Sequence, residues 1–110
     1  MKTPNWQPVQ LTQKDGFKLV LSFEEEYSCG YDHFVNECDW SKEDYESIKN
    51  FYWFCAKVTA FKGKIECGTK YLGACCHKSK KDVIETDLGG YLPQMIEQAI
   101  DEAKQNLEIK

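Results

Sequence analysis

Arginine is absent from this sequence of 110 residues, and its fourteen basic residues are all lysines. Arginine supplies the planar, two-pronged donor that proteins commonly use to bind phosphate groups and guanine. The eighteen acidic residues outnumber the lysines, so the chain carries a net charge of -4 at pH 7. Proteins that bind a nucleic-acid backbone gather lysine and arginine on one surface. The composition therefore predicts that this protein does not bind nucleic acid directly.

Long hydrophobic runs, internal repeats and linker-like segments are also missing. No stretch approaches the roughly 20 apolar residues of a membrane-spanning helix, and the start, MKTPNWQPVQ, lacks the hydrophobic segment of a secretion signal. We therefore expect no membrane contact. A hydrophobic content of 42% and an aromatic content of 14% argue against disorder, and the length suits a single domain over residues 1–110. Six cysteines without an export signal predict reduced thiols and a cytoplasmic protein.

Motifs for catalysis, metal binding and cofactor binding are absent as well. The glycines form neither a dinucleotide-binding nor a phosphate-binding loop, and no two cysteines have the CxxC spacing of a zinc ligand pair. We therefore predict no catalytic residue, no metal and no cofactor. One alternative stays open, in which the segment Cys75-Cys76-His77, with Cys67 upstream, is the centre of a small metal- or cysteine-dependent enzyme or accessory factor.

The first hydrophobic segment, residues 9–23, is typical of a β-hairpin that turns near Asp15-Gly16. A two-residue loop and a three-residue loop give different registers. The three-residue loop Lys14-Asp15-Gly16 places Leu11 opposite Leu19 and gathers the apolar residues on one face. We therefore predict this loop and this register.

A second hairpin is predicted for residues 51–72, where small and hydrophobic residues flank Lys62-Gly63. A two-residue loop at Lys62-Gly63 places Ala60 opposite Ile65, and one face of the hairpin is then almost wholly apolar or small. Lysine is unusual at a turn position that needs positive φ, so the type of turn stays open.

Helices are predicted in three places. Ser41 and Asp44 have the spacing of a capping box and indicate a short helix over residues 42–50. Ser79 indicates a cap for a helical turn over residues 80–86. The longest helix follows Gly89-Gly90, and its apolar stripe consists of Leu92, Met95, Ile96, Ala99, Ile100, Ala103 and Leu107. Together these elements predict an α+β fold, an antiparallel sheet of about four strands from two hairpins, covered by the C-terminal helix.

The segment between the hairpins combines acidic and aromatic residues without clear periodicity. Apolar anchors surrounded by charge are typical of protein–protein interfaces, whereas a solvated loop is the simpler interpretation of a charged run. We predict that this surface binds a protein partner. The predicted binding residues are Glu24, Glu25, Glu26, Tyr31, Asp39, Trp40, Glu43 and Asp44.

Three short motifs carry a resemblance to a known group of proteins. They are WxCxxVxA at residues 53–60, YLGxC at residues 71–75 and GGYxxxM at residues 89–95. In these motifs the chain resembles small, uncharacterised proteins encoded by bacteriophages and prophages. The resemblance implies a phage or mobile-element accessory protein that acts in the cytoplasm of a host bacterium.

Small acidic phage proteins without enzymatic motifs resemble inhibitors of host defence, including anti-CRISPR and anti-restriction proteins. The expected function is accordingly non-catalytic binding to a host protein or nucleoprotein complex. Whether the exposed edges of the sheet also pair to form a homodimer stays open at this point.

Overall fold

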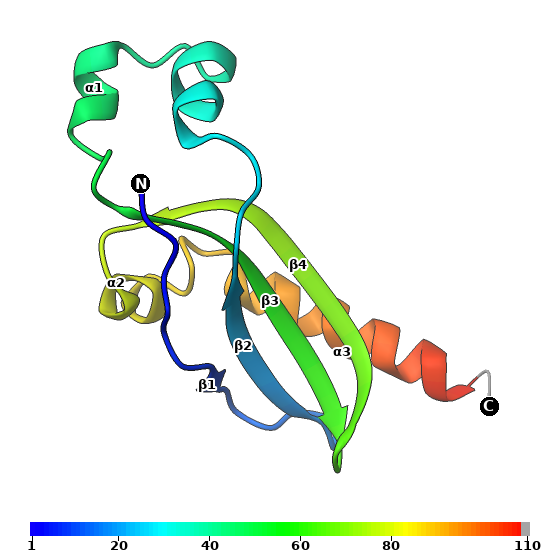
Figure 1. Ribbon diagram of the computed structural model, residues 1–110. Coiled ribbons are helices and arrows are strands. Elements are labelled where there is room, and N and C mark those ends of the chain that lie inside the picture. Colours follow the sequence, from blue (N-terminus) through cyan, green and yellow to red (C-terminus); the bar gives the residue numbers. More distant parts are fainter. Residues whose placement is uncertain (109–110) are drawn as a thin grey trace.

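The computed structural model describes residues 1–108 and contains a four-stranded antiparallel sheet with a long helix across one face (Figure 1). The strands lie in chain order and are β1 (Val9–Gln10), β2 (Lys18–Glu24), β3 (Tyr52–Lys62) and β4 (Ile65–His77). The helices are α1 (Lys42–Glu46), α2 (Lys80–Glu85) and α3 (Leu92–Glu108), with a short π-helix, η1 (Asp32–Glu37). The predicted α+β fold is confirmed. Within residues 1–108, no helix is both long and apolar enough to cross a membrane.

The first hairpin has the predicted register but a different turn. Val9 pairs with Leu21, as the hydrophobic pattern requires. The loop, however, is the two-residue Asp15-Gly16, closed by hydrogen bonds in both directions between Lys14 and Phe17. Both loop residues have positive φ, 54° and 83°, which is typical of the tight turns that match the twist of a hairpin. Between the turn and the paired strands, the β1 side of the hairpin has one residue more than the β2 side, and this extra residue gives the predicted pairing of Val9 with Leu21. The predicted three-residue loop is therefore wrong.

The second hairpin turns one residue later than predicted. Its loop is Gly63-Lys64, and Lys62 pairs with Ile65. Gly63 has a φ of 63°, a conformation that costs glycine little because it has no Cβ. The predicted loop at Lys62-Gly63 is therefore wrong, since the glycine occupies the first loop position and the lysine ends the strand.

Two irregularities shift the register of β4 against β3 still further. Ala60 faces Gly68 instead of the predicted Ile65, and Phe54 faces Cys75. Bulges of this kind insert an unpaired residue into one strand and leave no clear sign in the hydrophobic pattern.

The C-terminal helix α3 covers the apolar face of β3 and β4, as predicted. Five residues of its predicted stripe are buried, whereas Ile96 and Leu107 are partly buried at the margin. The sheet contributes Leu19, Leu21, Phe54, Ala56, Val58 and Ala60 to the same core. Burial of this surface is the main source of stability, at roughly 25 cal/mol per Å² of apolar area.

A single glycine allows α3 to approach the sheet closely. A Cβ added at Gly68 would lie 2.6 Å from the backbone nitrogen of Ala103 and closer still to the carbonyl oxygen of Ala99. These neighbours are helix backbone and cannot move aside as a flexible side chain can. The small residues Ala99 and Ala103 complete the contact from the helix side, and both are fully buried.

The short helices begin where their serine caps predict. Ser41 Oγ accepts a hydrogen bond from the Asp44 N–H at 3.1 Å, and Ser79 caps α2 in the same way. Helix α1 ends at Glu46, earlier than the predicted range 42–50, because Ser47 caps its last turn and donates its hydroxyl to Asp44 C=O. The π-helix η1 was not predicted.

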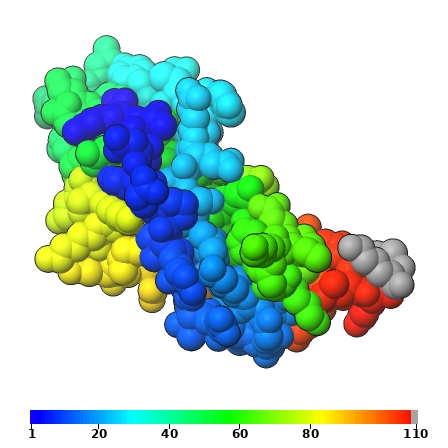
Figure 2. Space-filling model, turned by 60° about the horizontal axis from the view of Figure 1, so that its bottom comes forward, coloured from blue at the N-terminus to red at the C-terminus, as the bar shows by residue number. Residues whose placement is uncertain are grey.

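Residues 25–51, which connect β2 to β3, form a lobe beyond one end of the sheet (Figure 1). Trp53 anchors this lobe, because its indole N–H donates to Ser28 C=O at 2.8 Å and its ring lies 5.8 Å from that of Phe34. The N-terminal segment reaches the lobe and runs beside α2 (Figure 2), and Lys2 pairs with Tyr52 at the start of β3. The lobe is therefore held to the sheet from two sides.

Candidate functional site

Charge is divided unequally between the lobe and the remainder of the protein. The lobe, residues 25–51, contains eight acidic residues and two lysines, which gives it a net charge of -6. The other 83 residues contain ten acidic residues and twelve lysines, a net charge of +2. The molecule extends 51 × 25 × 20 Å, and the acidic lobe occupies one end of the sheet (Figure 1). The net charge of -4 for the whole chain is therefore smaller in magnitude than the charge of the lobe, whose surface is strongly acidic.

Aromatic side chains accompany this charge, and several keep an exposed face. Tyr27 is 89% exposed and Trp40 is 37% exposed. The Trp40 ring lies 4.6 Å from the ring of Phe34, so one side of the indole is held in place while the other meets solvent. Tyr31 is half-buried against Tyr45, with ring centroids 5.1 Å apart. Trp40 is therefore the best-positioned apolar anchor among the predicted residues.

The predicted binding residues fall into two groups. Asp39, Trp40, Glu43 and Asp44 are exposed near the start of α1, within the lobe. Asp39 has a φ of 59°, a left-handed conformation that aspartate tolerates better than most residues. This group lies within residues 39–44, and its three carboxylate side chains are exposed to solvent.

The second group, the run Glu24-Glu25-Glu26, has a different setting. Glu24 ends β2 and pairs across the sheet with Lys57 at 3.7 Å, whereas Glu25 is exposed. Glu26 accepts hydrogen bonds from the backbone N–H groups of Ala74 and Ser28. It therefore stabilises the bulge in β4 and is not a free carboxylate on the surface. Nothing in the local sequence distinguishes Glu26 from its two neighbours, because its contact with Ala74 joins residues 48 positions apart.

The contact between Glu26 and the bulge predicts a pH-dependent contribution to stability. Burial alone would raise the pKa of the Glu26 carboxyl group, but the backbone hydrogen bonds from Ala74 and Ser28 lower it below its ordinary value of 4.5. A carboxyl group whose pKa is lower in the folded state than in the unfolded state stabilises the protein at pH values above its unfolded-state pKa. This stabilisation is lost as the pH falls through the folded-state pKa. Glu26→Gln should therefore reduce the free energy of unfolding at pH 7 by about 1 kcal/mol.

Urea titrations of both proteins across the acid range measure this difference. The difference in the free energy of unfolding between wild type and Glu26→Gln should be constant at neutral pH and should become smaller below pH 4.5. Glu25→Gln is the matched control, because Glu25 is the preceding residue and its side chain is exposed. Its free energy of unfolding should equal that of the wild type across the same pH range. A gap for Glu26→Gln that does not change with pH would contradict the proposed role.

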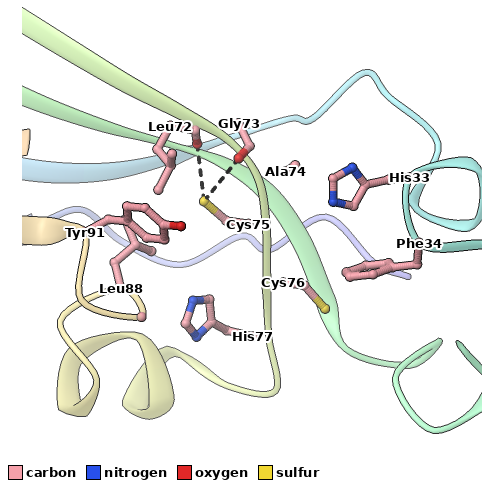
Figure 3. A pocket seen from close by; sticks show the side chains of 11 residues that line it. His33, Phe34, Leu72, Gly73, Ala74, Cys75, Cys76, His77, Leu88 and Tyr91 are labelled. Atoms are coloured by element: carbon pink, nitrogen blue, oxygen red, sulfur yellow. Dashed lines mark hydrogen bonds between the residues drawn. The ribbon is translucent and has the colours of Figure 1, made fainter. Parts of the chain in front are cut away.

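Next to the lobe lies an open cavity of about 470 Å³, at the end of β4 (Figure 3). Residues 72–77 of β4 form its floor, His33 and Phe34 of the lobe form one wall, and residues 88–91 before α3 form another. Successive side chains of β4 point to opposite sides, so that Cys75 and His77 lie with Tyr91 while Cys76 points towards Phe34.

Both imidazoles of the cavity lie beside a carboxylate: His33 Nδ1 is 3.5 Å from Glu37 Oε2, and His77 is held more closely. Its Nδ1 lies 2.8 Å from Asp82 Oδ2, and the two side chains are 12% and 26% exposed. Asp82 is itself held in the first turn of α2, where its backbone N–H donates to Ser79 Oγ. This pairing orients the ring and leaves Nε2 as the nitrogen available to a ligand.

The cavity cysteines do not have the properties of an activated nucleophile. Burial raises the pKa of the Cys75 thiol to about 12 and that of Cys76 to about 11. Cys75 Sγ also donates to Leu72 C=O at 3.2 Å. All six cysteines are unpaired, and residues 1–108 contain no group of three or more potential side-chain ligands close enough to hold a metal ion. Nucleophilic chemistry needs a thiolate, whereas these thiols are neutral at pH 7.

The raised thiol pKa values predict the order of alkylation. At pH 8 iodoacetamide should modify the exposed Cys29 and Cys38 first, and Cys75 should react only after unfolding. Mass spectrometry of tryptic peptides taken over time measures each site. The control is the same reaction in 6 M guanidinium (roughly twice the midpoint concentration of an ordinary domain), where all six thiols should react alike. Rapid modification of Cys75 in the folded protein would contradict the assignment.

Unusual backbone conformations surround this cavity. Ala74, Asp87 and Leu88 all have positive φ without being glycine, and Gly89 and Gly90 continue the left-handed segment. Such conformations cost about 1–2 kcal/mol for each non-glycine residue and persist where the surrounding structure enforces them. Leu88 is fully buried, so the packing around its side chain holds this backbone conformation in place. The sequence indicated only the glycines as helix breakers and gave no sign of the strained residues beside them.

No protein-family model, curated protein or solved structure matches this chain. The proposals on function therefore depend on the geometry of the lobe and the adjoining cavity, together with the motifs noted in the sequence.

Proposed function

We propose that this protein is a non-catalytic binding protein that docks the acidic lobe, residues 25–51, on a basic surface of another protein. The observation that carries the proposal is the concentration of negative charge and exposed aromatic rings on this lobe. Helices η1 and α1 contain no buried residue, so these elements contribute little to the core. The packing of the core does not account for the exposed residues of these two helices, whereas binding to a partner does.

The two kinds of side chain have separate roles in this proposal. Carboxylates such as Asp39, Glu43 and Asp44 attract a basic partner at long range and raise the association rate. Trp40 provides apolar contact area after docking, and tryptophan is among the residues most enriched at interface hot spots. Association is then sensitive to salt, whereas the lifetime of the complex depends on the aromatic contact.

The partner that fits this surface best is a host protein or nucleoprotein complex with an exposed basic groove. A groove that binds nucleic acid is positive, and an acidic lobe competes for it without contacting nucleic acid itself. The resemblance of the three motifs at residues 53–60, 71–75 and 89–95 to phage and prophage proteins supports an accessory role in the cytoplasm of a bacterium. An inhibitor of host defence, of the anti-CRISPR or anti-restriction type, combines these features.

Affinity capture from a bacterial lysate tests the proposal with two charge-matched variants. The lobe variant carries Asp39→Lys, Glu43→Lys and Asp44→Lys. The control carries Glu66→Lys, Asp101→Lys and Glu108→Lys, three exposed residues outside the lobe. A specific partner should be retained by the wild type and the control but lost by the lobe variant. Equal capture by both variants would contradict docking through the lobe.

A further inference from the structure

Strand β4 is an edge strand, because it pairs with β3 on one side and no strand formed by residues 1–108 lies on the other. Alternate residues of an antiparallel strand direct their backbone groups to opposite sides. The Trp53 N–H donates to Lys2 C=O, away from β4, and Trp53 pairs with Cys76. This pair is therefore not hydrogen bonded, and the N–H and C=O of Cys76 point away from the sheet. They are available to an incoming strand.

The first half of the same edge is covered by α3. Asn106 donates its side-chain amide to Cys67 C=O at 2.6 Å, and Glu102 accepts from the Thr69 N–H at 3.4 Å. These contacts satisfy two of the outward groups of β4 near the hairpin, the C=O of Cys67 and the N–H of Thr69. Beyond the bulge at Gly73 and Ala74, no residue in the described range 1–108 covers Cys76 in this way. The edge is thus protected along one half and open along the other.

The open half lies on the floor of the cavity next to the lobe (Figure 3). His33 and Phe34 rise on one side of β4, and Leu88 and Tyr91 rise on the other. An added strand would place alternate side chains against these two walls, which is how strand addition combines main-chain affinity with side-chain selectivity. A second copy of this protein pairing at this edge would bring its own lobe, also with a net charge of -6, next to the first.

The charge of the surroundings indicates the chemistry of the segment. One wall belongs to the lobe with its net charge of -6, and the carboxylates of Glu26 and Asp82 lie beside the floor. Three lysines, Lys78, Lys80 and Lys81, follow the strand, and the N-terminal amine is close enough to act on Cys76. Lys81 is paired with Glu85 at 3.6 Å, and the remaining positive charges offset the charge of the lobe only in part. We propose that an extended, lysine- or arginine-bearing segment of the partner adds as a strand to β4 at residues 74–77. This inference rests on the proposed function, because the lobe brings the basic partner to the open edge.

A labelled ten-residue peptide of alternating lysine and valine tests strand addition directly. Its matched control carries the same charges but is N-methylated at alternate residues, so that one edge cannot donate hydrogen bonds. Fluorescence anisotropy at low salt should show that the unmethylated peptide binds about tenfold more tightly, as expected for one or two net main-chain hydrogen bonds. Equal affinities, or no binding at a millimolar peptide concentration, would overturn the proposal.

Variants at Cys76 separate the edge from the lobe. Cys76→Pro removes the outward N–H but leaves the ladder with β3 intact, because proline is tolerated where an edge N–H faces solvent. It should bind the unmethylated peptide about tenfold more weakly than Cys76→Val, which also lacks the thiol but keeps the N–H. The lobe variant should weaken both peptides alike. If the lobe variant binds normally but Cys76→Pro does not, the lobe proposal fails and the edge proposal stands. If Cys76→Pro binds like the wild type, strand addition is wrong.

Amide hydrogen exchange provides a readout at single-residue resolution. In the free protein the Cys76 amide should exchange quickly, while its paired neighbours Cys75 and His77 should be protected. Saturating peptide should slow exchange at Cys76 by at least about tenfold, the protection given by a stable hydrogen bond. Protection of Cys76 in the free protein, together with a dimer on size-exclusion chromatography, would mean that a second copy occupies the edge and would overturn the proposal.

Discussion

Val58→Asp is expected to abolish cooperative unfolding. Val58 is fully buried in the middle of β3, where it pairs with Leu21 and lies under α3. An aspartate there would bury a carboxylate without a partner, and the resulting penalty of several kcal/mol is comparable with the roughly 5–15 kcal/mol total stability of a small domain. Circular dichroism during heating should show a cooperative transition for the wild type and none for the variant.

Ile65→Asp is the matched control for this experiment. Ile65 is a β-branched residue of the same sheet but is 64% exposed at the start of β4. Its replacement by aspartate should change the free energy of unfolding by no more than about 0.5 kcal/mol, as is usual for surface positions. If Val58→Asp melts at the wild-type temperature, the core does not lie between β3 and α3.

Gly68→Val is expected to detach α3 from the sheet. The first side-chain carbon would already overlap the backbone of Ala99 and Ala103, so the helix must move away from β4. We expect a loss of roughly 3 kcal/mol or more, the upper end for overpacked cores. Urea denaturation gives the change in free energy, and binding of a hydrophobic dye reports the exposed core.

Lys70, two residues further along β4, provides the control for Gly68→Val. It is exposed, and Lys70→Val introduces the same β-branched side chain at a position that already carries a Cβ. This variant should keep wild-type stability to within about 0.5 kcal/mol. Equal stability of the two variants would show that α3 does not pack closely on Gly68.

Local patterns were sufficient to predict the elements that are periodic along the chain. The stripe of α3 was evident because apolar residues recur at helical spacing, and the register of the first hairpin followed from the need to bury Leu19 and Leu21 together. The turns were predicted less well. Loop length depends on which residues adopt positive φ, and the hydrophobic pattern does not show this. A bulge adds one residue to a strand, so two loop lengths that differ by one residue can leave the same side chains on the buried face.

The candidate site is harder to predict because it joins segments that are distant in sequence. The cavity brings together residues 33–34, 72–77 and 88–91, and no single segment shows the spacing of a site. The acidic character of the lobe was visible in the sequence, but the separate role of Glu26 depends on its contact with Ala74, 48 residues away. The histidine–carboxylate pair was missed because Asp82 lies on a different element from His77.

The association rate of the captured partner, measured as a function of ionic strength, tests docking through the acidic lobe most directly. For the wild type, the rate constant should fall by about tenfold or more between low salt and about 0.5 M salt, because the Debye length shortens. The lobe variant should associate slowly at all salt concentrations, and Trp40→Ala should instead speed dissociation. A rate constant that is independent of salt and equal in the wild type and the lobe variant would contradict docking through the lobe.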